Sequence, residues 1–92
     1  MDERVIWEVD AWIVDASGSH YHLEDMPKRF DSNQFSHDPE LTLRRAKGFF
    51  HKTVGNMYDN NANRKVQTCV LYNVYGNVLL TEVIEINQQG GE

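Results

Sequence analysis

The chain has 92 residues, a formal net charge of -5, one cysteine and a hydrophobic fraction of 40%. A chain this short buries one core at most, and Cys69 alone can form neither an internal disulfide nor a structural zinc cage. No apolar run reaches the roughly 20 residues of a membrane span, and the acidic N-terminus is unlike a signal peptide. We therefore expect one soluble, cytoplasmic domain over residues 1–92.

The first quarter of the chain predicts a β-hairpin. From Val5 to Asp15, apolar residues alternate with period two along one side, as in a half-buried strand. Residues 15–19 favour turn geometry, and His20 to Glu24 can run back antiparallel as a short second strand.

The next segment, from Asp25 to His37, has no periodicity and contains Pro27 and many polar residues. It predicts a loop. Phe30 and Phe35 are its apolar exceptions, and they would pin the loop to the body of the protein as a packed excursion.

A helix is predicted to begin after Asp38, because aspartate caps free N–H groups and Pro39 suits the first helical position. Apolar residues at spacings of three and four extend the predicted helix to about Tyr58. Its predicted buried stripe consists of Leu43, Ala46, Phe50, Val54 and Met57. Its predicted outer side carries Arg44, Arg45, Gly48, Lys52 and Gly55. Each interior glycine costs about 1 kcal/mol relative to alanine; a closely approaching partner and simple tolerance are both explanations.

The last third predicts a second hairpin. Lys65 to Val74 and Asn77 to Ile86 are rich in strand-forming residues, and Tyr75-Gly76-Asn77 separates them as a tight turn. The polar, glycine-rich residues 87–92 are expected to fray. Together the elements predict an α+β fold of the order β-β-α-β-β, with one amphipathic helix packed on one face of a four-stranded antiparallel sheet.

Charge is distributed unevenly along the chain. Residues 1–26 hold seven acidic residues and one arginine, residues 27–65 hold eight basic and four acidic residues, and residues 66–92 hold three acidic residues. The basic middle segment covers the predicted helix and its flanking loops. Such a patch suits phosphates or an acidic protein surface, although an ordinary solvated helix face explains the same charges.

We predict a partner-binding surface on this basic segment. Phe49 is its predicted anchor, because an aromatic ring flanked by cations suits an interface, and packing on Phe30 or Phe35 is the alternative. The full predicted set is Arg44, Arg45, Lys47, Phe49, Lys52, Lys28, Arg29, Arg64 and Lys65.

Other residue types point only weakly to chemistry. His20 and His22 share one face of the predicted second strand and can chelate a metal if further ligands converge, but exposed strand histidines are the favoured interpretation. Cys69 lies in an apolar strand, where a buried, inert thiol is normal. No phosphate-binding glycine loop, nucleophile elbow or His-Glu-x-x-His motif occurs. We expect no enzymatic activity, no metal, no cofactor and no small-molecule substrate.

The strand residues leave two further alternatives. Aromatic residues of the strands, namely Trp7, Trp12, Tyr72 and Tyr75, can serve as base-stacking platforms. Acidic neighbours such as Glu8 would repel a phosphate backbone, so a role in the core is favoured for most of them. Exposed apolar strand residues such as Leu79 or Trp12 would instead suit a structural or oligomerising protein.

The chain is small and acidic, and it has asparagine-rich loops. Two β-rich segments follow the run Asp38-Pro39-Glu40-Leu41-Thr42-Leu43-Arg44-Arg45-Ala46-Lys47. In this layout the chain resembles small phage or mobile-element proteins, and among them the anti-CRISPR inhibitors of multi-subunit type I surveillance complexes. The resemblance implies a non-enzymatic inhibitor that binds the assembly of Cas proteins and guide RNA and blocks target DNA hybridisation. The basic helix face would then contact RNA, and the acidic end of the first strand would contact basic Cas surfaces.

Overall fold

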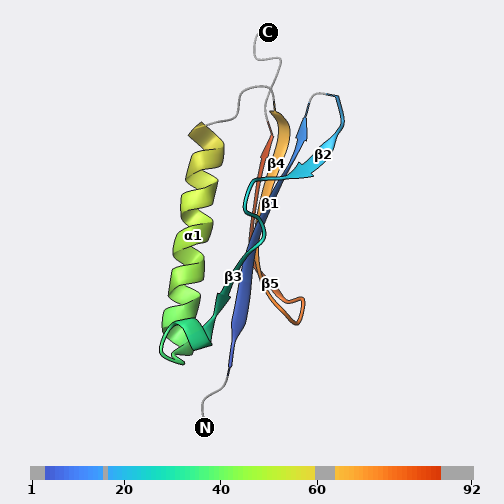
Figure 1. Ribbon diagram of the computed structural model, residues 1–92. Coiled ribbons are helices and arrows are strands. Elements are labelled where there is room, and N and C mark those ends of the chain that lie inside the picture. Colours follow the sequence, from blue (N-terminus) through green and yellow to red (C-terminus); the bar gives the residue numbers. More distant parts are fainter. Residues whose placement is uncertain (1–3, 16, 60–63, 86–92) are drawn as a thin grey trace.

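The computed structural model describes residues 4–15, 17–59 and 64–85. One long helix, α1 (Pro39–Asp59), lies along one face of an antiparallel sheet (Figure 1). This architecture confirms the predicted α+β class and the order β-β-α-β-β, with one additional short strand.

The sheet is built around its first strand. β1 (Ile6–Asp15) pairs along its length with β4 (Arg64–Asn73), and β5 (Val78–Glu85) pairs with the far side of β4. On its other side, β1 pairs with β2 (His20–His22) near one end and with β3 (Lys28–Asp31) near the other. All pairings are antiparallel. β5 forms one edge of the five-stranded sheet, and the two short strands β2 and β3 form the other.

The predicted loop from Asp25 to His37 is wrong in its middle part, which accounts for the fifth strand. β3 occupies four of these residues, and the 3-10 helix η1 (Ser32–Gln34) follows it. Asp31 ends the strand: its carboxylate accepts from the Asn33 N–H at 3.0 Å, and its own N–H donates to the Gln34 side chain at 3.3 Å, which completes a capping box. The prediction that Phe30 and Phe35 pin this segment is confirmed, because Phe30 is buried in the core and Phe35 packs against the core.

The helix agrees with its prediction. The Asp38 carboxylate caps it by accepting from the N–H groups of Glu40 at 3.0 Å and Leu41 at 3.2 Å. Within the predicted stripe, Ala46, Phe50 and Met57 are buried, and Leu43 and Val54 are half-buried against the core. The outer-side residues Arg44, Arg45, Gly48, Lys52 and Gly55 are exposed.

The second hairpin is confirmed as well. Gly76 has a φ of +90°, which a residue with a side chain rarely adopts, and the Asn73 side chain accepts from the Tyr75 and Asn77 N–H groups at 2.9 and 3.1 Å. The predicted frayed tail, residues 87–92, lies outside the described residues.

The two faces of the sheet differ in burial. The face toward α1 carries the fully buried residues Val9, Ala11, Gln67, Cys69 and Leu71. On the other face, Trp12, Thr68 and Val83 form one row across β1, β4 and β5. Because side chains alternate along a strand, these residues point away from α1, and we call their side of the sheet the open face. Trp12 and Thr68 are half-buried there, and Val83 is exposed.

Candidate functional site

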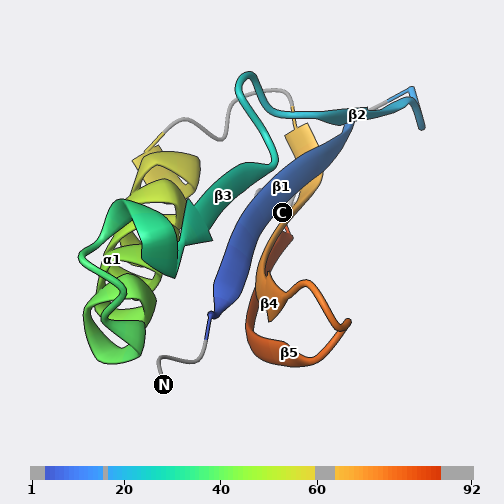
Figure 2. The same ribbon diagram turned by 60° about the horizontal axis from the view of Figure 1, so that its bottom comes forward.

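β3 and the segment before it lie beside α1 (Figure 2). Side chains from both sides line a groove there. Two hollows share Phe49 and Lys52. The aromatic hollow has a volume of about 340 Å³ and is lined by Phe30, Phe35, Arg44, Arg45, Gly48, Phe49 and Lys52. The methionine pocket has a volume of about 450 Å³ and is lined by Leu23, Glu24, Met26, Phe49, Lys52, Thr53, Asn56 and Met57. These two hollows together, with Lys28 beside Phe49, are the basic groove.

Three phenylalanines form the apolar part of the aromatic hollow. The Phe30 ring stacks on Phe35 with centroids 6.3 Å apart and meets Phe49 at 5.6 Å. Phe30 is buried, whereas Phe35 and Phe49 are half-buried. Phe49 therefore packs on Phe30, as one alternative predicted, and still exposes part of its ring to the groove.

Cations surround these rings. The Arg45 guanidinium lies 5.9 Å from the Phe35 centroid, and the Lys28 ammonium lies 5.9 Å from the Phe49 centroid. Within the described part of the chain, neither these two cations nor Arg44 and Lys52 pair with a carboxylate. Their charges are available to a partner, and the contacts with the rings hold two of them at the rim of the hollow.

Gly48 keeps the aromatic hollow open. A Cβ atom built on Gly48 meets nothing within 4 Å, and the same holds for Gly55, which lies about two turns further along the same side of the helix. Gly48 lines the hollow, whereas Gly55 lines neither hollow. A partner in the aromatic hollow would therefore contact Gly48 but not Gly55.

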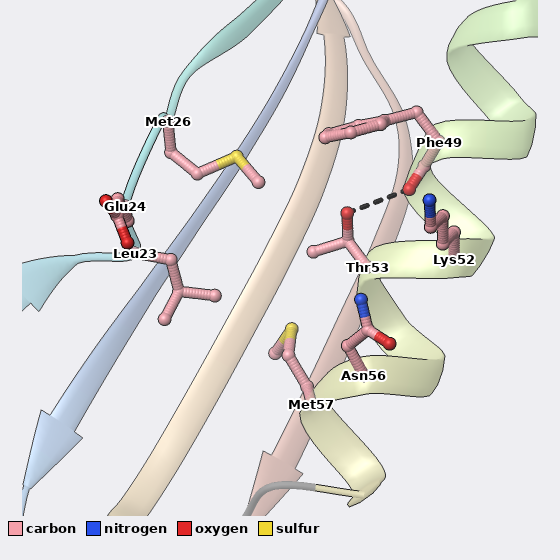
Figure 3. A pocket seen from close by; sticks show the side chains of 8 residues that line it. All are labelled: Leu23, Glu24, Met26, Phe49, Lys52, Thr53, Asn56 and Met57. Carbon is pink, nitrogen blue, oxygen red and sulfur yellow. Dashed lines mark hydrogen bonds between the residues drawn. The ribbon is translucent and has the colours of Figure 1, made fainter.

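The methionine pocket continues the groove toward the end of α1. Figure 3 shows Leu23 and Met26 facing Thr53 and Met57 across the pocket, with the Phe49 ring at one end. The Thr53 hydroxyl donates to the Phe49 carbonyl at 2.8 Å, so its polar group is satisfied within the helix. Flexible methionine side chains adapt to irregular apolar partners, which suits this pocket to an apolar anchor.

Arg29 is separated from the groove although it follows Lys28 directly. The two residues point to opposite faces of β3 because side chains alternate along a strand. The Arg29 guanidinium donates to Glu8 at 2.9 Å on the open face of the sheet, and Glu8 also accepts from the Tyr72 hydroxyl at 2.7 Å. The hydrogen bond from Tyr72, followed by that from Arg29, lowers the pKa of Glu8. The charge of Arg29 is thus compensated within the protein.

The remaining predicted residues lie elsewhere or outside the described side chains. Lys47 is exposed but lines neither hollow, since it precedes Phe49 by two residues and so lies about 200° away around the helix. Arg64 and Lys65 begin β4, and their side chains are outside the part that the structure describes. The structure therefore brings together Lys28, Arg44, Arg45, Phe49 and Lys52.

The aromatic strand residues have separate environments. Trp7 packs against the core, Trp12 lies edge-on to His22 with ring centroids 6.2 Å apart, and Tyr72 bonds to Glu8. Tyr75 is 80% exposed at the hairpin turn. These positions do not form one stacking platform.

The histidines and the cysteine gain no further ligands among the described residues. His22 Nδ1 lies 2.9 Å from Asp10 Oδ1, but no group of three or more His, Cys, Asp or Glu residues in residues 4–15, 17–59 and 64–85 is placed to hold a metal ion. Burial raises the pKa of the Cys69 thiol to about 12, so it stays protonated near neutral pH.

Comparisons with family models, curated proteins and solved structures found no match to this chain. No helix among the described residues is long and apolar enough to cross a membrane.

Proposed function

We propose that this is a non-enzymatic binding protein that places its basic groove on an anionic surface of a macromolecular partner. The observation that carries the proposal is a set of four cations around three phenylalanine rings, none of which pairs with a carboxylate of residues 4–15, 17–59 or 64–85. Exposed cations steer an anionic partner toward the surface, and an apolar hollow among them holds a partner side chain or base once it arrives.

The dimensions of the groove suit an extended segment. From Arg44 to Met57, α1 advances about 20 Å along its axis. A segment of about six extended residues spans that distance. Glu24 supplies the only carboxylate among the lining residues. The groove is thus positive over the aromatic hollow and more neutral at the methionine pocket, which favours a partner whose negative charge is concentrated at one end of its contact.

The specific partner we propose is a type I CRISPR surveillance complex in the cytoplasm of a bacterial host. The resemblance in layout to phage anti-CRISPR proteins suggests this partner. Acidic surfaces of the Cas proteins and the guide-RNA backbone both present negative charge to the groove. Occupation of such a surface would block hybridisation of the guide to target DNA by direct contact, without a chemical step.

The test compares two matched charge reversals, Lys52→Glu and Lys47→Glu. Both change the same residue type on the exposed side of α1 by the same charge, but only Lys52 lines the groove. We expect Lys52→Glu to raise the Kd for the assembled complex at least about tenfold and Lys47→Glu to change it less than about twofold. Binding is measured by titration with the complex, and inhibition by the mobility shift of labelled target DNA.

Three further results complete the test. Wild-type affinity should fall as salt rises, because exposed charges are screened. Titration of guide RNA alone separates an RNA contact from a Cas protein contact. Equal Kd values for the two variants would refute the groove, and no binding of the wild type to any type I complex would refute the proposed partner.

A further inference from the structure

The two hollows of the basic groove differ in charge. Arg44, Arg45 and Lys52 line the aromatic hollow, and no carboxylate of the described chain lines it. Lys52 also lines the methionine pocket, but Glu24 opposes its charge there. The groove therefore favours a ligand with negative charge at one end only. A single RNA strand carries a phosphate on every nucleotide, so it would place negative charge at both ends.

The interior of the methionine pocket suits an apolar group. Met57 and Thr53 are buried on its helix side. Leu23 and Met26 are half-buried and face them from the opposite wall (Figure 3). The Thr53 hydroxyl already donates its proton to the Phe49 carbonyl. A phosphate among these side chains would lose water without gaining a hydrogen bond from them, whereas an apolar side chain would bury its surface.

The phenylalanine rings of the aromatic hollow are poor platforms for a nucleobase, which stacks on the face of an aromatic ring. The Phe35 ring already contacts Phe30 and has the Arg45 guanidinium over it. The Phe49 ring likewise contacts Phe30 and has the Lys28 ammonium over it. A stacking base would have to displace one of these cations. Carboxylates need no such displacement, because they can pair with the cations where they lie.

We propose that the basic groove binds an extended acidic segment of a protein, with carboxylates at the aromatic hollow and one apolar side chain in the methionine pocket. This inference rests on the proposed function and selects a protein contact over an RNA contact. Arg45 and Thr53 are eight residues apart, or about 12 Å along α1. An extended chain covers that distance in about four residues, and an even spacing keeps both side chains on the same side of the chain.

Two synthetic peptides of opposite chain direction test the charge and the anchor. They are acetyl-Glu-Ser-Glu-Ser-Gly-Ser-Leu-Ser-amide and its reversal, and in each the leucine lies four positions from the nearer glutamate. We expect one of them to bind the wild-type chain with a Kd below about 1 mM. Replacing its leucine by serine should raise that Kd at least about tenfold, because the apolar burial is lost. Replacing its glutamates by glutamines should also raise it at least about tenfold.

NMR signals of the methionine methyl groups locate the anchor. Met26 and Met57 line the methionine pocket but not the aromatic hollow. In the wild-type chain labelled at methionine methyl groups, the leucine peptide should shift both signals. The serine variant of the peptide should shift them less at the same bound fraction, because its side chain leaves the pocket empty of apolar groups.

The trinucleotide UpUpU is the matched RNA probe, since its two phosphates equal the charge of the two glutamates. It should bind more weakly than the leucine peptide. Binding of neither peptide below about 1 mM, equal or tighter binding of UpUpU, or unmoved Met26 and Met57 signals would overturn the inference. If the assembled complex still discriminates Lys52→Glu from Lys47→Glu after such a result, the proposed function stands and only the protein ligand is wrong. Equal Kd values of the complex for the two variants would instead refute the groove itself.

Discussion

Gly48 and Gly55 form a natural pair for separating the stability of α1 from the use of its surface. Both lie on the exposed side of the helix, and neither has atoms within 4 Å of the position that a Cβ would occupy. Only Gly48 lines the aromatic hollow. We therefore predict that Gly48→Leu and Gly55→Leu stabilise the protein equally but affect partner binding differently.

The size of the stability gain follows from helix propensity. Leucine in a helix interior is favoured over glycine by about 0.8 kcal/mol, and no clash at the Cβ opposes this gain. At about 2.1 cal/mol/K per residue, the unfolding entropy of 92 residues is about 0.19 kcal/mol/K, so each variant should raise the Tm by about 4 °C. The two sites are about 10 Å apart along the helix, and their effects should add in the double variant.

Gly48→Leu and Gly55→Leu should differ in their effect on partner binding. A leucine side chain at position 48 projects over a hollow of about 340 Å³ and excludes an apolar group of the partner. We expect Gly48→Leu to weaken binding at least about tenfold, or about 1.4 kcal/mol, and Gly55→Leu to leave the Kd within about twofold. Thermal melts followed by circular dichroism measure the first effect, and titration with the assembled complex measures the second. Equal affinities for the two variants would refute the role of the aromatic hollow, and an unchanged Tm would refute the propensity argument.

Two further predictions concern ionisable groups. The hydrogen bond from Arg4 lowers the pKa of Asp31 from 3.8 to about 2, so the stabilisation by its carboxylate is present above pH 4 and is lost as the pH falls toward 2. Urea midpoints of the wild type and Asp31→Asn should therefore converge over this range; a constant difference would contradict the assignment. Burial raises the pKa of the Cys69 thiol to about 12, so a disulfide reagent at pH 8 should label the native chain far more slowly than the urea-unfolded chain. Rapid labelling of the native chain would show that the thiol is accessible.

The elements predicted correctly from the sequence are those whose patterns are long and local. The 21-residue helix repeats its apolar stripe several times and carries its own cap at Asp38. The β4–β5 hairpin joins two long runs by a turn of few residues. β3 has only four residues, and its partner is β1, whose paired residues lie 19 to 25 positions earlier in the chain. A strand this short has no period to detect, and it exists because β1 offers an unpaired edge.

The residues of the basic groove likewise fall into those that a local pattern predicts and those that only tertiary packing brings together. Arg44, Arg45, Phe49 and Lys52 belong to one helix surface, so helical spacing alone places them together. Leu23, Met26 and Phe30 complete the groove from the opposite wall, and only tertiary packing brings them there. The sequence predicts that Phe30 packs on the body of the protein but not which surface it meets, and Leu23 and Met26 belong to no periodic apolar pattern that would place them in the groove.

The register of β3 also determines which of its two basic residues, Lys28 or Arg29, lies at the basic groove. Charge counting along the chain gives Lys28 and Arg29 equal weight in a basic patch. The pleat of β3 sends Lys28 to the Phe49 ring and Arg29 to Glu8 on the other face, where Tyr72 shares the carboxylate. A shift of β3 by one residue would turn Lys28 toward Glu8 and place the Arg29 guanidinium beside Phe49. A guanidinium, unlike an ammonium, can form two parallel hydrogen bonds with one anionic group. The strength of the basic groove therefore depends on the register between β3 and β1 as much as on the number of basic residues in the segment.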